Sequence, residues 1–316
     1  MRRTRGFGEL DLGIGDYAHL GVLIFFVISG FLITTLLKEE FALQGAISLT
    51  GFYARRTVRI FPAAFVYLAV ILTLWRVGVI DVTLRDMIHA ATYSVNFQSL
   101  PSHAVVHLWS LSVEEQFYLL WPFAFARLGP RRAVWVAVAV VLIAPLARIG
   151  DRLFLLDTPF HNLPMFSMVA DSLAVGCLLA EWKGRLALFG WYRALLKPLP
   201  SLVMVVGVLL IHRYMNRTVG LVIGTSAINV LIAILIHRCL LVQQGAWFRI
   251  LNWKPIVWIG GLSYSLYLWQ QLFIDRSGGL WMNWFPQNAV LAVVAALASF
   301  YLVERPLQGL RRRLRS

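Results

Sequence analysis

The sequence is poor in charge and in cysteine. Only 14% of its 316 residues are charged, whereas 59% are hydrophobic and the mean hydropathy is +0.72. A water-soluble domain carries about one quarter charged residues, so an ordinary soluble enzyme is excluded. The two cysteines, Cys177 and Cys239, lie in apolar stretches. No disulfide framework is therefore expected, and the fold must be held together by packing.

Acidic residues are scarce relative to basic ones. Fifteen Asp and Glu stand against 29 Lys and Arg, which gives a formal net charge of +14. The basic residues are scattered between apolar runs and form no continuous stripe, so nucleic acid is not an expected partner. No pair of His or acidic residues recurs at a ligand spacing, so no metal site is expected either.

Apolar runs long enough to cross a bilayer, about 20 helical residues, are abundant. Nine candidate spans lie at 20–37, 61–80, 107–126, 133–147, 164–181, 199–215, 219–237, 256–274 and 286–303. They predict an all-α integral membrane protein, a bundle of about nine transmembrane helices. We expect one domain over residues 1–316, with an irregular N-terminal segment at 1–19 and a basic tail at 307–316.

The loops differ in basic charge, which predicts the orientation. One alternate set of connections carries 19 Lys and Arg, and the other set carries seven. Basic residues stay on the cytoplasmic side, so the C-terminal tail is expected in the cytoplasm and, with nine spans, the N-terminus outside. Arg2, Arg3 and Arg5 would then be exported without a preceding apolar segment, so the chain reads as though a first helix were missing.

The segment GFYARRTVRIFPAAF (51–65) contains three arginines, Arg55, Arg56 and Arg59. They lie at the cytoplasmic end of a predicted span. Their spacing puts them on one helical face, where guanidinium groups can bind phosphate oxygens in bidentate fashion. The alternative is that they anchor the helix to anionic lipid headgroups. Pro62 fits the first turn of a helix.

Polar residues gather at the start of the span in HLWSLSVEEQFYLLWP (107–122), at its outer mouth. They are His107, Ser110, Ser112, Glu114, Glu115 and Gln116. So many polar groups at membrane depth are costly, and on a helix His107, Ser110 and Glu114 share a face that could line one polar cavity. The alternative for Ser112 and Glu115 is a capping box at a helix start.

A third polar segment is GGLSYSLYLWQQ (260–271), where Ser263, Tyr264, Tyr267 and Gln271 recur every three or four residues. One face of hydroxyls and rings suits a sugar or an acyl chain, although Tyr also serves as an interfacial anchor. Asp171 and Asn229 are further polar residues inside predicted spans, where an ionisable group is a site hypothesis by default.

Five segments occur in the order seen in acyltransferase family 3: GVLIFFVISGFLIT, FYARRTVRIFPA, HLWSLSVEEQFYLLWP, GLSYSLYLW and a terminal VERP. The sequence resembles this family of bacterial multipass membrane proteins from about Leu20 to Pro306. The resemblance implies transfer of acetyl or related acyl groups from acyl-CoA to sugar hydroxyls. It also implies that Arg55, Arg56 and Arg59 contact the CoA phosphates.

Two features depart from the family. Its members usually have ten spans, and their first helix carries an Arg and a His that are not identifiable here. Gln270 stands where relatives commonly have His. His19 precedes the span that corresponds to the family's second helix, so the role of the family's His is not transferred to it.

We therefore expect an acyltransferase of the cell inner membrane that uses acyl-CoA, with acetyl-CoA as the favoured donor, and a glycan or glycolipid acceptor. His107 is the expected base, assisted by Glu114 or Glu115. The expected substrate-binding residues are Trp109, Ser110, Ser112, Tyr264 and Tyr267. The alternative function is a non-catalytic membrane scaffold or transporter for a lipid-linked glycan or acyl carrier.

Overall fold

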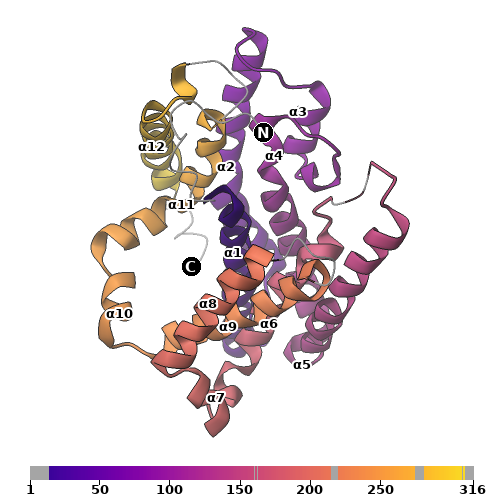
Figure 1. The fold of residues 1–316 in the computed structure, drawn as a ribbon, viewed down its shortest axis with the longest axis vertical. Coiled ribbons are helices and arrows are strands. Elements are labelled where there is room, and N and C mark those ends of the chain that lie inside the picture. Colours follow the sequence, from indigo (N-terminus) through magenta and orange to yellow (C-terminus); the bar gives the residue numbers. More distant parts are fainter. Residues whose placement is uncertain are drawn as a thin grey trace. The chain divides into compact units, whose positions relative to one another are not determined.

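The computed structural model describes residues 14–159, 161, 163–214, 220–274, 281–307 and 309. Over these residues the chain forms helices and turns and no strand (Figure 1). The all-α fold class is confirmed.

Five helical stretches of the described chain are long and apolar enough to cross a bilayer. They are Ala18–Gln44, Leu49–Arg76, His103–Phe154, Val222–Leu241 and Gln287–Leu307. Their lengths of 20 residues or more match the thickness of a bilayer core. The chain is a multi-pass membrane protein, while the count of nine spans stays a prediction.

The described chain divides into two compact units. Unit 1 holds the described residues of Ser48–Glu115 and Ile250–Ser316. Its helices are α2 (Leu49–Arg76), α3 (Leu84–Ala91), η1 (Val95–Phe97), α4 (His103–Val106), α11 (Lys254–Phe273), η3 (Trp281–Asn283), α12 (Gln287–Ser299) and η4 (Phe300–Glu304), with the start of α5 (Leu108–Phe154).

Unit 2 holds Gly13–Ile47 and Gln116–Arg249. It contains α1 (Ile14–Gln44), the rest of α5, α6 (Phe166–Leu186), α7 (Gly190–Leu195), α8 (Pro198–Tyr214), η2 (Gly220–Gly224) and α9 (Thr225–Leu241). The short helix α10 (Gly245–Leu251) spans the boundary. Figure 1 shows α6, α8 and α9 close together, and α6 and α8 both pack on α9.

Two helix starts lie earlier than expected. Helix α1 begins at Ile14, so the prediction of an irregular segment is wrong for residues 14–19; residues 1–13 lie outside the described residues. Helix α2 begins at Leu49, where Ser48 caps it by accepting from the Gly51 N–H at 3.2 Å. Pro62 therefore lies inside α2, and its placement in a first turn is wrong.

Helix α5 contains the two spans expected at 107–126 and 133–147. The break between them is at Gly129, whose φ of 72° and ψ of 166° are not helical. Glycine adopts positive φ at little cost, and the following Pro130 disfavours the helical conformation at residue 129. The break therefore lies between the two expected spans, and their separate crossing of the membrane stays a prediction.

Close approach of α1 and α6 organises unit 2. A Cβ at Gly30 would collide with the Leu173 carbonyl, and one at Gly176 would collide with the Val27 carbonyl. Small residues on facing helices permit such backbone contact, as is common in membrane bundles. The close contact between α1 and α6 therefore requires glycine at both positions.

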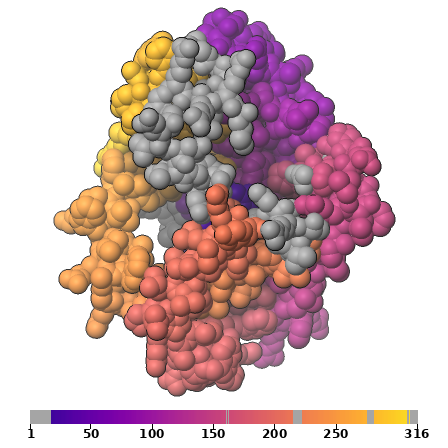
Figure 2. Space-filling model, viewed as in Figure 1, coloured from indigo at the N-terminus to yellow at the C-terminus, as the bar shows by residue number. Residues whose placement is uncertain are grey.

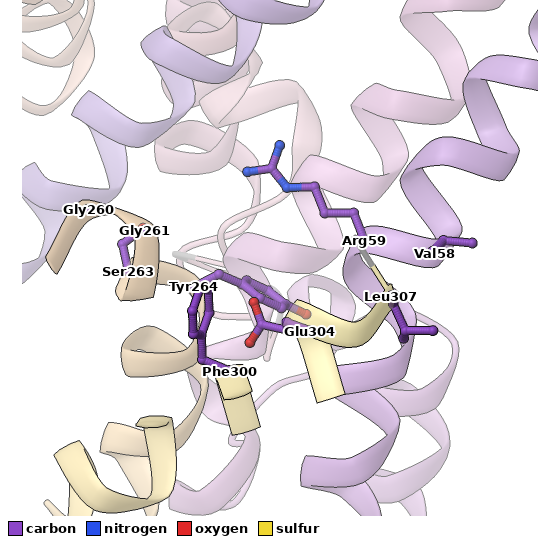
Figure 3. A pocket seen from close by; sticks show the side chains of 9 residues that line it. All are labelled: Val58, Arg59, Gly260, Gly261, Ser263, Tyr264, Phe300, Glu304 and Leu307. Atoms are coloured by element: carbon purple, nitrogen blue, oxygen red, sulfur yellow. The ribbon is translucent and has the colours of Figure 1, made fainter. Parts of the chain in front are cut away.

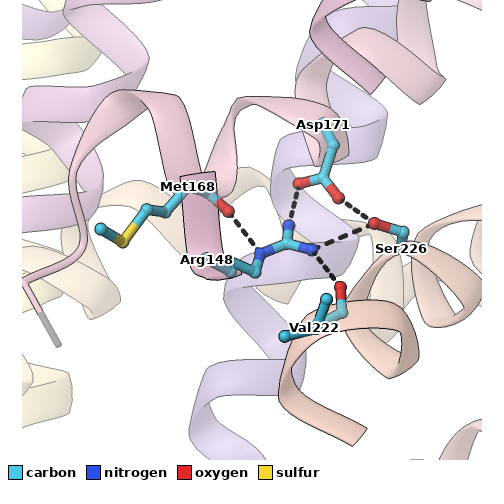
Figure 4. Close-up of polar contacts among 5 residues, drawn as sticks. All are labelled: Arg148, Met168, Asp171, Val222 and Ser226. Atoms are coloured by element: carbon cyan, nitrogen blue, oxygen red, sulfur yellow. Dashed lines mark hydrogen bonds and ion pairs between the residues drawn. The ribbon is translucent and has the colours of Figure 1, made fainter. Parts of the chain in front are cut away.

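A buried ion pair joins α5, α6 and α9 in unit 2 (Figure 4). The Arg148 guanidinium lies 2.6 Å from the Asp171 carboxylate, and Asp171 is 0% exposed. Arg148 also donates to the carbonyls of Met168 and Val222 and to the Ser226 hydroxyl, which itself donates to Asp171. The partner of Asp171, which the sequence did not identify, is thus Arg148.

Apolar side chains also cover exposed surface of unit 2. In the space-filling view of Figure 2 the salmon-coloured atoms of α8 lie at the surface. Its exposed residues include Leu199, Leu202, Val203 and Val206. In a multi-pass protein such a surface is expected to contact lipid, because the hydrocarbon core is as apolar as these side chains.

Candidate functional site

The three predicted arginines lie in the first turns of α2, and their environments differ. Arg56 is 7% exposed, and its guanidinium lies 5.6 Å from the centroid of the Phe52 ring. Arg55 is half-buried, and Arg59 is exposed. Arg59 is therefore the most accessible of the three cations to a ligand.

Arg59 lines a cavity of about 200 Å³ in unit 1 (Figure 3). The other lining residues are Val58, Gly260, Gly261, Ser263, Tyr264, Phe300, Glu304 and Leu307. In Figure 3 the Arg59 guanidinium is directed away from Glu304, whose carboxylate lies beside the rings of Tyr264 and Phe300. The cavity thus combines a cation, a carboxylate and aromatic walls.

His107 joins α4 to α5 and is 7% exposed. Its Nε2 lies 3.1 Å from the Leu268 carbonyl oxygen in α11. A carbonyl can only accept, so Nε2 carries the proton and the neutral ring keeps its lone pair on Nδ1. Nδ1 is buried and has no hydrogen-bond partner among the described residues. This is the tautomer that a base needs, held by a backbone acceptor.

Two tyrosine rings surround His107. Tyr67 lies edge-on at 5.7 Å between centroids, and Tyr267 lies at 5.4 Å. The Tyr67 hydroxyl donates to the Ala104 carbonyl at 2.6 Å. These contacts fix the position of the imidazole relative to α2 and α11.

Ser110 and Tyr267 are hydrogen-bonded to one another at 2.6 Å. The Tyr267 hydroxyl donates to the His107 carbonyl at 2.7 Å, so the Ser110 hydroxyl is the donor in the shared bond. The structure brings these two predicted residues together, and they connect α5 to α11. Their hydroxyl protons are both used within the protein.

Ser112 is inside α5 and not at a helix start. Its hydroxyl donates to the Leu108 carbonyl at 2.9 Å and accepts from the Val95 N–H at 3.2 Å. Since α5 begins at Leu108, the alternative of a capping box formed by Ser112 and Glu115 is wrong.

Glu114 and Glu115 lie near Tyr93 and α2. Burial, and then the negative charges of Glu115 and Glu114, raise the pKa of Tyr93 above its usual value of 10. Tyr93 stacks on Phe61 of α2 at 5.2 Å, and Glu115 interacts electrostatically with Arg56. Along α5 the glutamates are about two turns from His107. Glu115 is therefore in electrostatic range of Arg56, and Glu114 is in range of Tyr267, which contacts the imidazole.

Tyr264 and Trp109 have packing contacts as well. The Tyr264 hydroxyl donates to the Ile60 carbonyl at 2.8 Å, which joins α11 to α2 next to the arginines. Trp109 is partly buried against the apolar core of unit 1. Both predicted residues thus lie in the unit that holds Arg59 and His107.

Helix α2 connects the arginines with the histidine. Arg59 and Tyr67 are eight residues apart, which is about 12 Å along the helix axis. Tyr67 contacts the His107 ring, so α2 carries Arg59 and a neighbour of the candidate base within about two turns of each other. The position of His107 relative to the membrane surface, at the outer mouth of its span, stays a prediction.

Comparison with known proteins gives the family. The profile of a family described as "Acyltransferase domain" matches residues 12–305. The chain belongs to this acyltransferase family. The match confirms the resemblance seen in the sequence and supports an enzyme that transfers acyl groups.

Two relatives of this acyltransferase family member are O-acetyltransferases by name. The O-acetyltransferase OatA of Staphylococcus aureus (strain NCTC 8325 / PS 47) is 29% identical over 332 residues, covering 92% of this chain and 52% of that protein. The "Putative peptidoglycan O-acetyltransferase YrhL" of Bacillus subtilis (strain 168) is 27% identical over 348 residues, covering 96% and 53%. The chain thus spans about half the length of these relatives. No solved structure matches it.

The site of this acyltransferase includes residues that sequence reasoning missed. Phe300 and Glu304 line the cavity although they are far from Arg59 in sequence, and the only signal was Glu304 in the VERP motif. His103 is exposed and contacts the Gln271 amide at 3.1 Å. His103 and Gln271 are 168 residues apart, so no local sequence pattern predicts their contact.

The segment between α2 and α4 is held together by the buried carboxylate of Asp86. Burial alone would raise the pKa of Asp86, but hydrogen bonds from the Thr83 N–H and hydroxyl, Gln98 and the Ser102 N–H lower it below 3.8.

Across the described ranges no three His, Cys, Asp or Glu are grouped as a metal site requires.

Proposed function

We propose that this acyltransferase transfers an acetyl or similar acyl group from acyl-CoA to a hydroxyl of a cell-envelope or exported glycan. The family match and the names of the two relatives support the reaction class. The observation that carries the proposal is that Arg59 lies about 12 Å along α2 from Tyr67, whose ring contacts His107, and that the Nε2 of His107 bonds the Leu268 carbonyl.

The donor is anchored by Arg55, Arg56 and Arg59. Guanidinium groups bind phosphate oxygens in bidentate fashion, and CoA carries its phosphates at one end. The acyl thioester then reaches along α2 toward His107. Glu115 lies within electrostatic range of Arg56, which is buried.

The chemistry is a direct transfer. Nδ1 of His107 takes the proton of the acceptor hydroxyl as its oxygen attacks the thioester carbonyl. The carbon–sulfur bond then breaks, the ester forms, and the CoA thiolate takes up a proton. The Leu268 carbonyl stabilises the protonated ring, because it accepts from Nε2 in both charge states.

The remaining predicted residues form the walls around the reacting groups. Trp109 and Tyr267 supply aromatic surface for the acyl arm or the sugar, and Tyr264 supplies it for the donor beside the arginines. Ser110 and Ser112 act on the carbonyl oxygen only if they exchange their present bonds, because both hydroxyl protons are already donated. Glu115 assists through its interaction with Arg56, and Glu114 through its interaction with Tyr267 beside His107.

Membrane placement follows from the charge asymmetry of the loops. The basic tail and the arginine end of α2 are on the cytoplasmic side of the inner membrane, where acyl-CoA is available. The glycan approaches from the opposite side. Phospholipids surround the helices.

The test supplies radiolabelled acetyl-CoA to membranes that contain the protein and follows label into glycan. The wild type transfers label, His107→Ala does not, and His161→Ala, a matched control in unit 2, transfers normally. Arg56→Ala weakens acetyl-CoA binding. Absence of transfer by the wild type would instead favour the scaffold or transporter function, and full activity of His107→Ala would remove this residue from the mechanism.

A further inference from the structure

We propose that the cavity beside Arg59 binds the adenine ring of the acyl donor and that Glu304 selects adenine through its exocyclic amine. This inference rests on the proposed use of acyl-CoA and deepens it. It assigns a ligand group to Phe300 and Glu304 of η4, to which the proposed function gives no role.

The cavity offers one group of each kind that an adenosine phosphate requires. Arg59 is an exposed cation at its wall and is in electrostatic range of Glu304. Glu304 is a half-buried carboxylate in the same cavity, and Phe300 presents an aromatic ring beside it (Figure 3). A phosphate, an N–H donor and a flat heterocycle are the matching ligand features.

The Glu304 carboxylate has hydrogen-bonding capacity left. The Ser265 hydroxyl donates to Oε1, and no other described residue donates to this carboxylate. A carboxylate has about four acceptor positions, so Oε2 is available to a ligand. An ionised carboxylate only accepts, which favours an amine over a carbonyl at the same place on a purine.

The neighbouring residues define the shape of the cavity. The Tyr264 hydroxyl is held by Ile60, so Tyr264 contributes its ring rather than a free donor. Cβ atoms at Gly260 and Gly261 would meet nothing within 4 Å. The two glycines therefore leave room for a ligand to approach the backbone of α11.

Adenine fits this set better than hypoxanthine. Its exocyclic amine donates to Glu304, whereas hypoxanthine presents a carbonyl oxygen there and is repelled. A site that is built around one hydrogen bond rejects the analogue that leaves it unpaired. The 3′-phosphate attached to the same nucleoside is within reach of a cation at the rim.

The experiment is a competition against radiolabelled acetyl-CoA on the full chain in lipid nanodiscs. The competitors are adenosine 3′,5′-bisphosphate and inosine 3′,5′-bisphosphate, which differ at the group that faces Glu304. The wild type is expected to prefer the adenine compound by at least about tenfold. Glu304→Gln, whose amide can donate to the inosine carbonyl, is expected to lose or reverse this preference.

The preference is a ratio within one preparation, so a variant that is partly unfolded still gives an interpretable value. Gly261→Leu fills the cavity and is expected to weaken both competitors, whereas Gly184→Leu, at an equally open glycine of α6, does not. An unchanged adenine preference in Glu304→Gln overturns the assignment. So does displacement of the adenine compound by vesicles of phosphatidylethanolamine, whose phosphate and ammonium lack a flat ring.

Failure of the two proposals is distinguishable. If the wild type binds no acetyl-CoA, the donor in the proposed function is wrong and this site has no adenine to select. If the wild type binds acetyl-CoA and transfers label but shows no preference between the two bisphosphates, only the role of Glu304 is refuted.

Discussion

Replacing Asp171 by alanine is expected to destabilise unit 2 strongly. Arg148 and Asp171 are 2.6 Å apart, with side-chain exposures of 10% and 0%. The substitution leaves the guanidinium charge with two carbonyls and one hydroxyl but no counter-charge. It also removes the acceptor that the Ser226 hydroxyl now uses.

The magnitude follows from the burial of the pair. Removing one partner of a buried ion pair costs about 3–5 kcal/mol, because the other charge stays in a low-dielectric environment. Asp171→Asn keeps an acceptor for Arg148 and Ser226 but loses the charge, so its cost is about 1.5–3 kcal/mol, the value of a charged hydrogen bond. The double variant Arg148→Met with Asp171→Leu is expected to be more stable than Asp171→Ala, since no charge remains buried.

A buried thiol gives a local measurement of this effect. Cys177 lies six residues after Asp171 in α6 and is 2% exposed, whereas Cys239 is exposed. In a Cys239→Ser background, the rate of maleimide labelling in increasing SDS reports the unfolding of unit 2 through Cys177. A cost below about 1 kcal/mol for Asp171→Ala would refute the reasoning, because it would mean that Arg148 is solvated without Asp171.

Three further predictions concern other contacts. Gly176→Val is expected to separate α1 from α6, because its Cβ would collide with the Val27 carbonyl, and to expose Cys177 to maleimide; normal protection would contradict the close contact. Because Asp86 has a lowered pKa, its stabilisation of the segment after α2 is complete above about pH 4 and is lost as the pH falls through the lower folded pKa. Hydrogen exchange of that segment should therefore accelerate in acid for the wild type, and Asp86→Asn should show no such acid step. Tyr267→Phe should reduce transfer by about tenfold by freeing Ser110, and wild-type activity would show that this bond does not position the site.

Local sequence patterns predicted the features that depend on neighbouring residues. Apolar runs gave the membrane helices, and the break at Gly129 lies between two expected spans. The arginine spacing predicted that three cations lie on a helix before the apolar core of the span, and all three lie in α2. These inferences needed only helical periodicity and composition.

Contacts between distant segments were not predictable from one sequence. The bond between His107 and the Leu268 carbonyl joins residues 161 apart, and its acceptor is a backbone atom that leaves no sequence signal. The pairing of Arg148 with Asp171 likewise depends on which helices pack together. The start of α2 was misplaced because hydropathy detects the apolar core of a helix and misses its polar first turns.

Pro62 divides α2 into two mechanically distinct parts. It has no N–H, so the Val58 carbonyl cannot have its usual partner four residues later, and the helix bends most easily at this joint. The arginines lie on one side of the joint, and Tyr67, which touches His107, lies on the other. A tilt of the part of α2 before Pro62 therefore changes the distance between the arginines and the His107 imidazole. The packing of the part after Pro62 is not disturbed.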